Sequence, residues 1–270
     1  MPAPQANPLL FTKLALWIVA AVGGGVLLAR RRVTRRVRLI ALLGGTLVFG
    51  FLYGLILGPA ANPNPVASLR TLLRVLLAGG PLAPMIVVMV VVLLALVWVS
   101  NKSICGWACQ LGLLQEAIYR LAPVRRRWKP PFWLSNGIRA AAFLALVGGL
   151  LLAGLDWIGL IDPFPLFSLR LGTWALLLVA GVLGASAFVF RPWCQFLCPF
   201  GLVGWIIEQR SLYRVRIDPD ICVSCGRCAV ACPTQAMADN LAGKAVRADC
   251  FACGDCLAAC PKEGALGWRR

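Results

Sequence analysis

The sequence predicts an α-helical integral membrane protein of about five transmembrane helices that carries a small α+β domain at its C-terminal end. Of the 270 residues, 60% are hydrophobic and 14% are charged, and the mean hydropathy is +0.81. These values lie far from the average of soluble proteins. Apolar runs alternate with short arginine-rich loops across 1–210, whereas 211–270 holds eight of the 12 cysteines. We therefore expect a membrane domain at 1–210 and a cysteine-rich domain at 211–270.

Five apolar runs approach the twenty or so residues needed to cross a bilayer core. They extend from Leu9 to Ala29, Leu39 to Ala60, Leu82 to Ser100, Ile138 to Leu160 and Gly172 to Phe190. The first run contains Lys13 near its start and is followed by an arginine cluster instead of a small-residue cleavage site. We interpret it as a retained helix rather than a signal peptide. The proline-bounded segment from Asn62 to Pro84 predicts an interfacial helix on the outer face, with a sixth short span as the alternative.

Positive charges gather on one side of the predicted membrane domain. The loops at 30–38 and 101–129 are rich in Arg and Lys, whereas the opposite loops hold only Arg70, Arg74 and Arg170. The positive-inside rule then predicts a multi-pass protein of the cell inner membrane, with its N-terminus outside and its cysteine-rich domain in the cytoplasm. The same rule accounts for the net charge of +17. Because no nucleic-acid reading module is recognisable, we expect no nucleic-acid partner.

The C-terminal cysteines form two quartets with the same spacing, C-x-x-C-x-x-C-x-x-x-C-P. This run ligates cubane clusters in bacterial-type ferredoxins, where three cysteines hold one cluster and the fourth serves the other. The predicted ligands of cluster 1 are Cys222, Cys225, Cys228 and Cys260, and those of cluster 2 are Cys250, Cys253, Cys256 and Cys232. Zinc would leave the third cysteine of each run unexplained, and disulfides would need an oxidising compartment. The sequence therefore predicts a bacterial-type 2[4Fe–4S] ferredoxin domain.

Two further cysteine pairs follow the third and fifth predicted spans and share the pattern C-x-x-x-C-x-x-G-L. The first pair is Cys105 and Cys109, and the second is Cys194 and Cys198. A spacing of four puts both thiols of a pair on one face of a helical turn, so two such faces could supply four soft ligands. Three interpretations remain open: a third iron–sulfur or metal centre, cysteines that only pack, and a redox-active thiol pair. The shared pattern itself predicts two copies of one structural unit.

The combination of membrane helices, paired C-x-x-x-C-P type motifs and a two-cluster ferredoxin domain resembles the NapH family. Members of that family are membrane-bound quinol dehydrogenase subunits of periplasmic nitrate reductase systems. The chain is also similar to the polyferredoxin half of the NosR family of nitrous oxide reductase maturation proteins. It departs from the NapH pattern at Gln110, where the family has proline, and in its five predicted spans, where the family usually has four. The resemblance implies electron transfer between the quinone pool and iron–sulfur partners.

A quinol that gives up its electrons also releases protons, so a quinol site needs a proton acceptor. The chain has no histidine, and we therefore expect no haem. Glu116 and Glu208 lie on the helices that follow the two cysteine pairs and are the candidate acceptors.

Two functional hypotheses follow. The first is an electron-transfer subunit that links quinol to another redox subunit or a soluble electron carrier, and the second is an electron-donating maturation factor for a metalloenzyme. The basic residues Arg210, Arg214 and Arg216 predict contact with anionic lipid headgroups, with the docking of an acidic carrier as the alternative. Trp107 and Trp193 are interpreted as interfacial belt residues.

Overall fold

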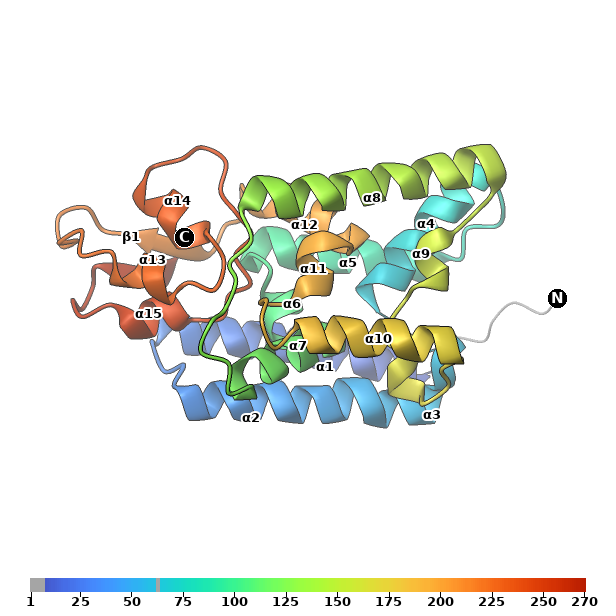
Figure 1. The fold of residues 1–270 in the computed structure, drawn as a ribbon, viewed down its shortest axis with the longest axis horizontal. Helices are drawn as coiled ribbons and strands as arrows, with labels where there is room; N and C mark the ends of the chain where they lie inside the picture. Colours follow the sequence, from blue (N-terminus) through green and yellow to red (C-terminus); the bar gives the residue numbers. More distant parts are fainter. Residues whose placement is uncertain (1–7, 62–63) are drawn as a thin grey trace.

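The computed structural model describes residues 8–61 and 64–270. Its helices form an elongated bundle, and a smaller domain made by the last part of the chain packs against one end of that bundle (Figure 1). Leu28, in the last turn of the first helix, and Val33, in the loop that follows, lie against Gly254 of the smaller domain. The arginine-rich loop at 30–38 is therefore at the same end of the bundle as the cysteine-rich domain.

Among the residues that the structure describes, three helices are long and apolar enough to cross a membrane. The first is α1 (Pro8–Ala29). The second runs from α2 (Arg35–Gly45) through a π-helical stretch, η1 (Thr46–Leu52), into α3 (Tyr53–Ala61). The third is α8 (Phe132–Ala153), on which Leu152 is 91% exposed. Large apolar side chains exposed along these helices are suited to a lipid surrounding.

The other two predicted spans are shorter as helices. α5 (Pro84–Ser100) has 17 residues and α10 (Thr173–Ala185) has 13. The end predicted for the fourth span, Leu160, was wrong, because α8 stops at Ala153, where Gly154 takes the left-handed conformation with φ 60°. The end predicted for the fifth span, Phe190, was also wrong, because α10 ends at Ala185.

The segment between the second and third spans forms α4 (Pro65–Ala78), which starts at a buried N-cap, Asn64. This helix packs against α5, α8 and α12 (Pro199–Glu208). Its Arg70 pairs with Asp156 at 2.9 Å and with Asp162 at 3.4 Å, next to α9 (Trp157–Leu160) and η2 (Phe164–Ser168). The predicted helix is present, and its interfacial position remains a prediction.

Short helices connect the bundle to the smaller domain. α6 (Ser103–Trp107) and α7 (Gln110–Leu121) follow α5, while α11 (Pro192–Phe196) and α12 follow α10. The smaller domain contains β1 (Arg214–Ile217), α13 (Arg227–Ala231), α14 (Ala236–Leu241), α15 (Asp255–Ala259) and β2 (Leu266–Arg269). β1 and β2 pair in antiparallel fashion, with Val215 opposite Trp268. Both of these side chains are buried in the core of the domain.

Candidate iron–sulfur sites

The two cysteine pairs of the bundle have the same local structure. Cys105 lies on α6 and Cys194 lies on α11, while Cys109 and Cys198 are the N-cap residues of α7 and α12. All four thiols are buried, and burial raises the pKa of each one, to about 12 for Cys194. Gln115 of α7, the helix that starts at Cys109, donates to the sulfur of Cys194 at 3.8 Å, so the second pair lies beside the helix of the first. A metal centre here would have to displace the thiol protons.

The glycine of the shared pattern has a steric reason. A Cβ atom at Gly112 would lie 2.9 Å from the carbonyl oxygen of Cys105, and a Cβ atom at Gly201 would lie 2.8 Å from the carbonyl oxygen of Cys194. Only glycine lets each helix approach the turn that carries the first cysteine so closely. Gln110 occupies the first helical position of α7, as proline does in α12, so the departure from the proline pattern leaves the helix start unchanged.

Glu116 lies at the centre of a buried ion network beside the first pair. Its carboxylate accepts hydrogen bonds from Arg38 at 2.8 Å, from Arg120 at 2.8 Å and from Arg191 at 2.5 Å. Arg191 also donates to the carbonyl oxygen of Cys105 at 2.5 Å. The network therefore connects the second cysteine segment to the first.

Asp249 is the centre of a matching network beside the second pair. It forms ion pairs with Lys102 and, at 2.9 Å, with Arg139. Arg139 donates to the carbonyl oxygen of Cys194 at 3.0 Å, as Arg191 does for Cys105. Because Asp249 precedes the first ligand predicted for cluster 2, this network connects the bundle cysteines directly to the ferredoxin domain.

The two candidate proton acceptors differ in their surroundings. Burial alone would raise the pKa of Glu116, but the guanidiniums of Arg38 and Arg191 outweigh it and hold this pKa well below its ordinary value. Burial raises the pKa of Glu208 to about 8, opposed by the charge of Lys102. One oxygen of Glu208 accepts the N–H of Cys250 at 3.0 Å, and the other lies 3.5 Å from the ammonium nitrogen of Lys102, as an ion pair without a hydrogen bond within the described part of the chain.

The membrane-side cysteine loop is in contact with the loop of cluster 2. A Cβ atom at Gly106 would overlap the carbonyl oxygen of Phe251. The neighbouring Trp107 donates its indole N–H to the carbonyl oxygen of Ala252 at 2.9 Å. The backbone next to Cys105 thus packs against the backbone between two predicted ligands of cluster 2.

The two ferredoxin loops repeat the same backbone conformation. Ser224 and Ala252, each two residues after the first cysteine of its quartet, both have a φ of 51°. Gly226 and Gly254 follow with φ values of 72° and 86°. Alternation into the left-handed region turns successive backbone N–H groups toward a common point, which is the arrangement that binds iron–sulfur clusters.

Each predicted ligand set lines one cavity. Cys222, Cys225, Cys228 and Cys260 line the first, and Cys232, Cys250, Cys253 and Cys256 line the second. Within residues 8–61 and 64–270, no three Cys, Asp or Glu side chains converge closely enough to hold a single metal ion. Each predicted ligand set surrounds a cavity, which suits a cubane cluster. Ligation itself remains a prediction.

Comparison with protein families matches both cysteine regions. The model described as "4Fe-4S dicluster domain" matches residues 214–262, and the model described as "4Fe-4S binding domain" matches residues 82–131 and 171–214. The second model thus matches each copy of the repeated unit once, and both copies contain their cysteine pair.

Comparison with curated proteins finds several relatives. The Escherichia coli (strain K12) protein YccM is 28% identical over 195 residues, which cover 66% of this chain and 54% of YccM. The ferredoxin-type protein NapH of Haemophilus influenzae is 27% identical, over 54% of this chain and 52% of NapH. The regulatory protein NosR of Pseudomonas aeruginosa is 27% identical, over 53% of this chain and 21% of NosR. The chain is a relative of NapH and NosR.

The resemblance predicted from the motifs is therefore confirmed. The chain spans about half the length of YccM and of NapH. No solved structure matches the chain significantly.

Sequence reasoning missed several residues of these sites. Arg38, in the basic loop at 30–38, was interpreted only as a charge that orients the chain in the membrane, but Arg38 and Arg191 are both buried partners of Glu116. Trp107 and Trp193 were expected in an interfacial belt, which is wrong, because both are buried in the packed core. The sequence signal that could have identified Arg191 is its position. It stands three residues before Cys194, as the basic residue Lys102 stands three residues before Cys105.

Proposed function

We propose that this chain is a membrane-bound iron–sulfur electron-transfer protein of quinol dehydrogenase type, linking the quinol pool to a redox partner. The observation that carries the proposal is the contact of Gly106 with Phe251, because it joins the membrane-side cysteine loop to the loop of cluster 2. The relatives support the general part of the proposal, since NapH is named a ferredoxin-type protein.

In this proposal the bundle cysteines hold a third iron–sulfur centre at the inner face of the membrane. Four buried thiols supply the ligands that such a centre prefers. Lys102, Arg139 and Arg191 stabilise the charge of a thiolate at Cys194, as expected around a centre with four anionic ligands. α5 and α10 complete a set of five spans, with the ferredoxin domain on the cytoplasmic side.

The order of the centres then follows from contact and exposure. The bundle site is next to cluster 2, and cluster 1 has the exposed ligand Cys225. When bound, a [4Fe–4S] cluster accepts or releases one electron, and a quinol releases two electrons and two protons, so two one-electron transfers balance each quinol. Glu116 would have to break its guanidinium contacts to take up a proton, which favours Glu208 as the acceptor on geometry.

The test is anaerobic reduction of the purified protein in detergent. A menaquinol analogue is added, and the loss of visible cluster absorbance is compared with full reduction by dithionite. We expect partial bleaching that disappears in the Cys194→Ala/Cys198→Ala double variant, while iron analysis and dithionite bleaching show intact ferredoxin clusters.

Two outcomes would contradict the proposal in different ways. Absence of bleaching by quinol in the unaltered protein would remove the quinol linkage and favour the maturation role suggested by the similarity to NosR. Equal bleaching in the double variant would show that the bundle cysteines are not on the electron path.

A further inference from the structure

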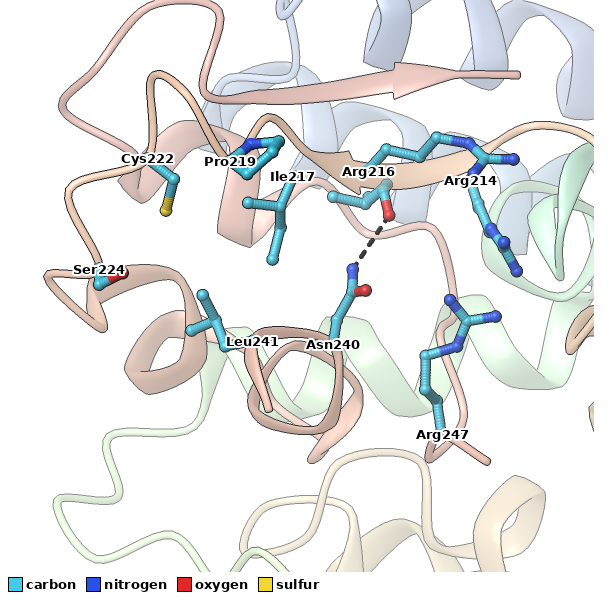
Figure 2. Close-up of a pocket in the computed structure, with 10 residues that line it drawn as sticks. Arg214, Arg216, Ile217, Pro219, Cys222, Ser224, Asn240, Leu241 and Arg247 are labelled. Atoms are coloured by element: carbon cyan, nitrogen blue, oxygen red, sulfur yellow. Dashed lines mark hydrogen bonds between the residues drawn. The ribbon is translucent and has the colours of Figure 1, made fainter. Parts of the chain in front are cut away.

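The ferredoxin domain contains an open pocket of about 470 Å³ between β1 and α14. Figure 2 shows Arg214, Arg216 and Arg247 around one part of it, with Cys222 and Ser224 at the other end of the row of lining residues. The pocket therefore gathers three guanidinium groups in one concave site.

The three arginines have no anionic partner within residues 8–61 and 64–270. None of them is in a salt bridge there, and the Nε atom of Arg216 is buried without a hydrogen-bond partner. Arg214 and Arg247 each donate to the carbonyl oxygen of Gln209, at 2.9 and 3.0 Å. Burial and repulsion by Arg247 and Arg216 lower the pKa of Arg214. Like charges held together in this way are stabilised by binding an anion.

The pocket adjoins the exposed side of cluster 1. Cys222 lines both the pocket and the cavity of cluster 1. Beside it Ile221 is 42% exposed and Val223 is 58% exposed, and the ligand Cys225 is also exposed. Apolar side chains around a cluster, next to a charged anchor, form the kind of small surface that transient electron-transfer partners cover.

We infer that the arginine pocket and the apolar rim of Ile221 and Val223 form the docking surface for an acidic electron-carrier protein, whose carboxylates enter the pocket beside cluster 1. This inference rests on the proposed electron-transfer function and names its partner chemistry. Guanidiniums bind carboxylates in a bidentate geometry, and the net charge of +17 steers an acidic protein toward the chain.

A carrier protein fits the pocket better than the lipid headgroups expected from the sequence. The basic end of the pocket meets the bundle at Gln209, directly after α12, and its other end reaches Cys222 of cluster 1, away from the cluster 2 loop that packs on the bundle through Phe251 and Ala252. A lipid headgroup would also leave the exposed rim of Ile221 and Val223 uncovered.

The test measures binding without electron transfer. The oxidised protein in detergent is titrated with flavin-free flavodoxin, an acidic probe protein that cannot accept electrons, at low and at moderate salt. We expect Arg216→Glu and Arg247→Glu each to raise the Kd for flavodoxin by about ten-fold or more and to reduce the salt dependence of binding. Arg216→Gln, which removes the positive charge without introducing a negative one, should give an intermediate loss of affinity.

The matched control is Arg126→Glu, which makes the same charge change at an exposed position outside the pocket and should leave the Kd nearly unchanged. Visible absorbance of the clusters checks folding in each variant. Flavodoxin binding that is absent at low salt, or equal in all variants, would overturn the inference. So would loss of short-chain phosphatidylglycerol binding in the pocket variants alone, since this would assign the pocket to lipid.

The quinol assay separates this inference from the proposed function. The clusters of the Arg216→Glu variant should bleach normally with the menaquinol analogue, because the pocket adjoins cluster 1, and the proposed path from quinol begins at the bundle cysteines. Normal bleaching with no flavodoxin binding would contradict only the docking surface, and binding without bleaching would contradict only the quinol linkage.

Discussion

The two cluster loops of the ferredoxin domain have one motif and one backbone conformation but opposite surroundings. The loop at Cys250 faces the helical bundle through Phe251, which also packs its ring against Phe190 at 5.8 Å. The loop at Cys222 faces outward, with Val223 exposed. In the proposed function, local spacing would specify how a cluster is held, and the packing around the loop would specify whether that cluster exchanges electrons within the protein or with a partner.

The largest loss of stability is expected when the buried ion network around Glu116, on the side of the bundle, is broken. Glu116→Gln leaves Arg38 and Arg191 buried without a full counter-charge, so we expect a loss of about 3–5 kcal/mol in the free energy of unfolding. Thermal unfolding in detergent measures it. Glu263→Gln, the same change at an exposed position, is the control and should have little effect. Equal stabilities of the two variants would mean that the network does not stabilise the contact between the two cysteine segments.

The contact between the two cysteine loops should give the next largest effect. Gly106→Ala places a methyl group on the carbonyl oxygen of Phe251, which should cost about 1–3 kcal/mol and displace the loop of cluster 2. We expect slower cluster reduction by the quinol analogue, with unchanged reduction by dithionite, which has access to cluster 1. Gly23→Ala, in α1 with open space around it, is the matched control. Unchanged quinol kinetics in Gly106→Ala would remove this contact from the electron path.

A smaller difference is expected between the rates at which an oxidant destroys the two clusters. Because Cys225 is exposed and Cys256 is buried, ferricyanide should destroy cluster 1 several-fold faster than cluster 2. Brief treatment followed by iodoacetamide and mass spectrometry should label Cys225 before Cys256. Simultaneous labelling of both would contradict the difference in access.

The smallest loss of stability is expected at the exposed surface of the ferredoxin domain. Asp218 pairs with Arg269 at 3.3 Å, and these side chains are 26% and 45% exposed. Asp218→Asn should therefore cost about 0–1 kcal/mol, as surface ion pairs usually do. Chemical denaturation followed by the cluster absorbance measures this cost. A loss as large as that of Glu116→Gln would mean that the outward side is as tightly coupled as the inward one.

The prediction of helix ends shows where sequence reasoning fails. Hydropathy identified the apolar runs, but Leu160 was included in a span because the run continues past Gly154, where the helix ends. Hydropathy measures transfer into lipid and carries little information about backbone conformation. In the same way, Arg139 falls within a predicted span and was not identified as a partner of Asp249, because that pairing joins residues 110 positions apart.

The sequence by itself determined the cysteine sets, the repeated unit and the apolar helices, because ligand spacing and hydropathy are local properties of the chain. The similarity to ferredoxin-type relatives follows from the same local patterns. Only the tertiary structure decided which cluster loop meets the bundle, which charges are buried as partners of Glu116 and Asp249, and which arginines surround a pocket. These features depend on contacts between distant segments, and burial and charge pairing have no fixed spacing in the sequence by which they could be recognised.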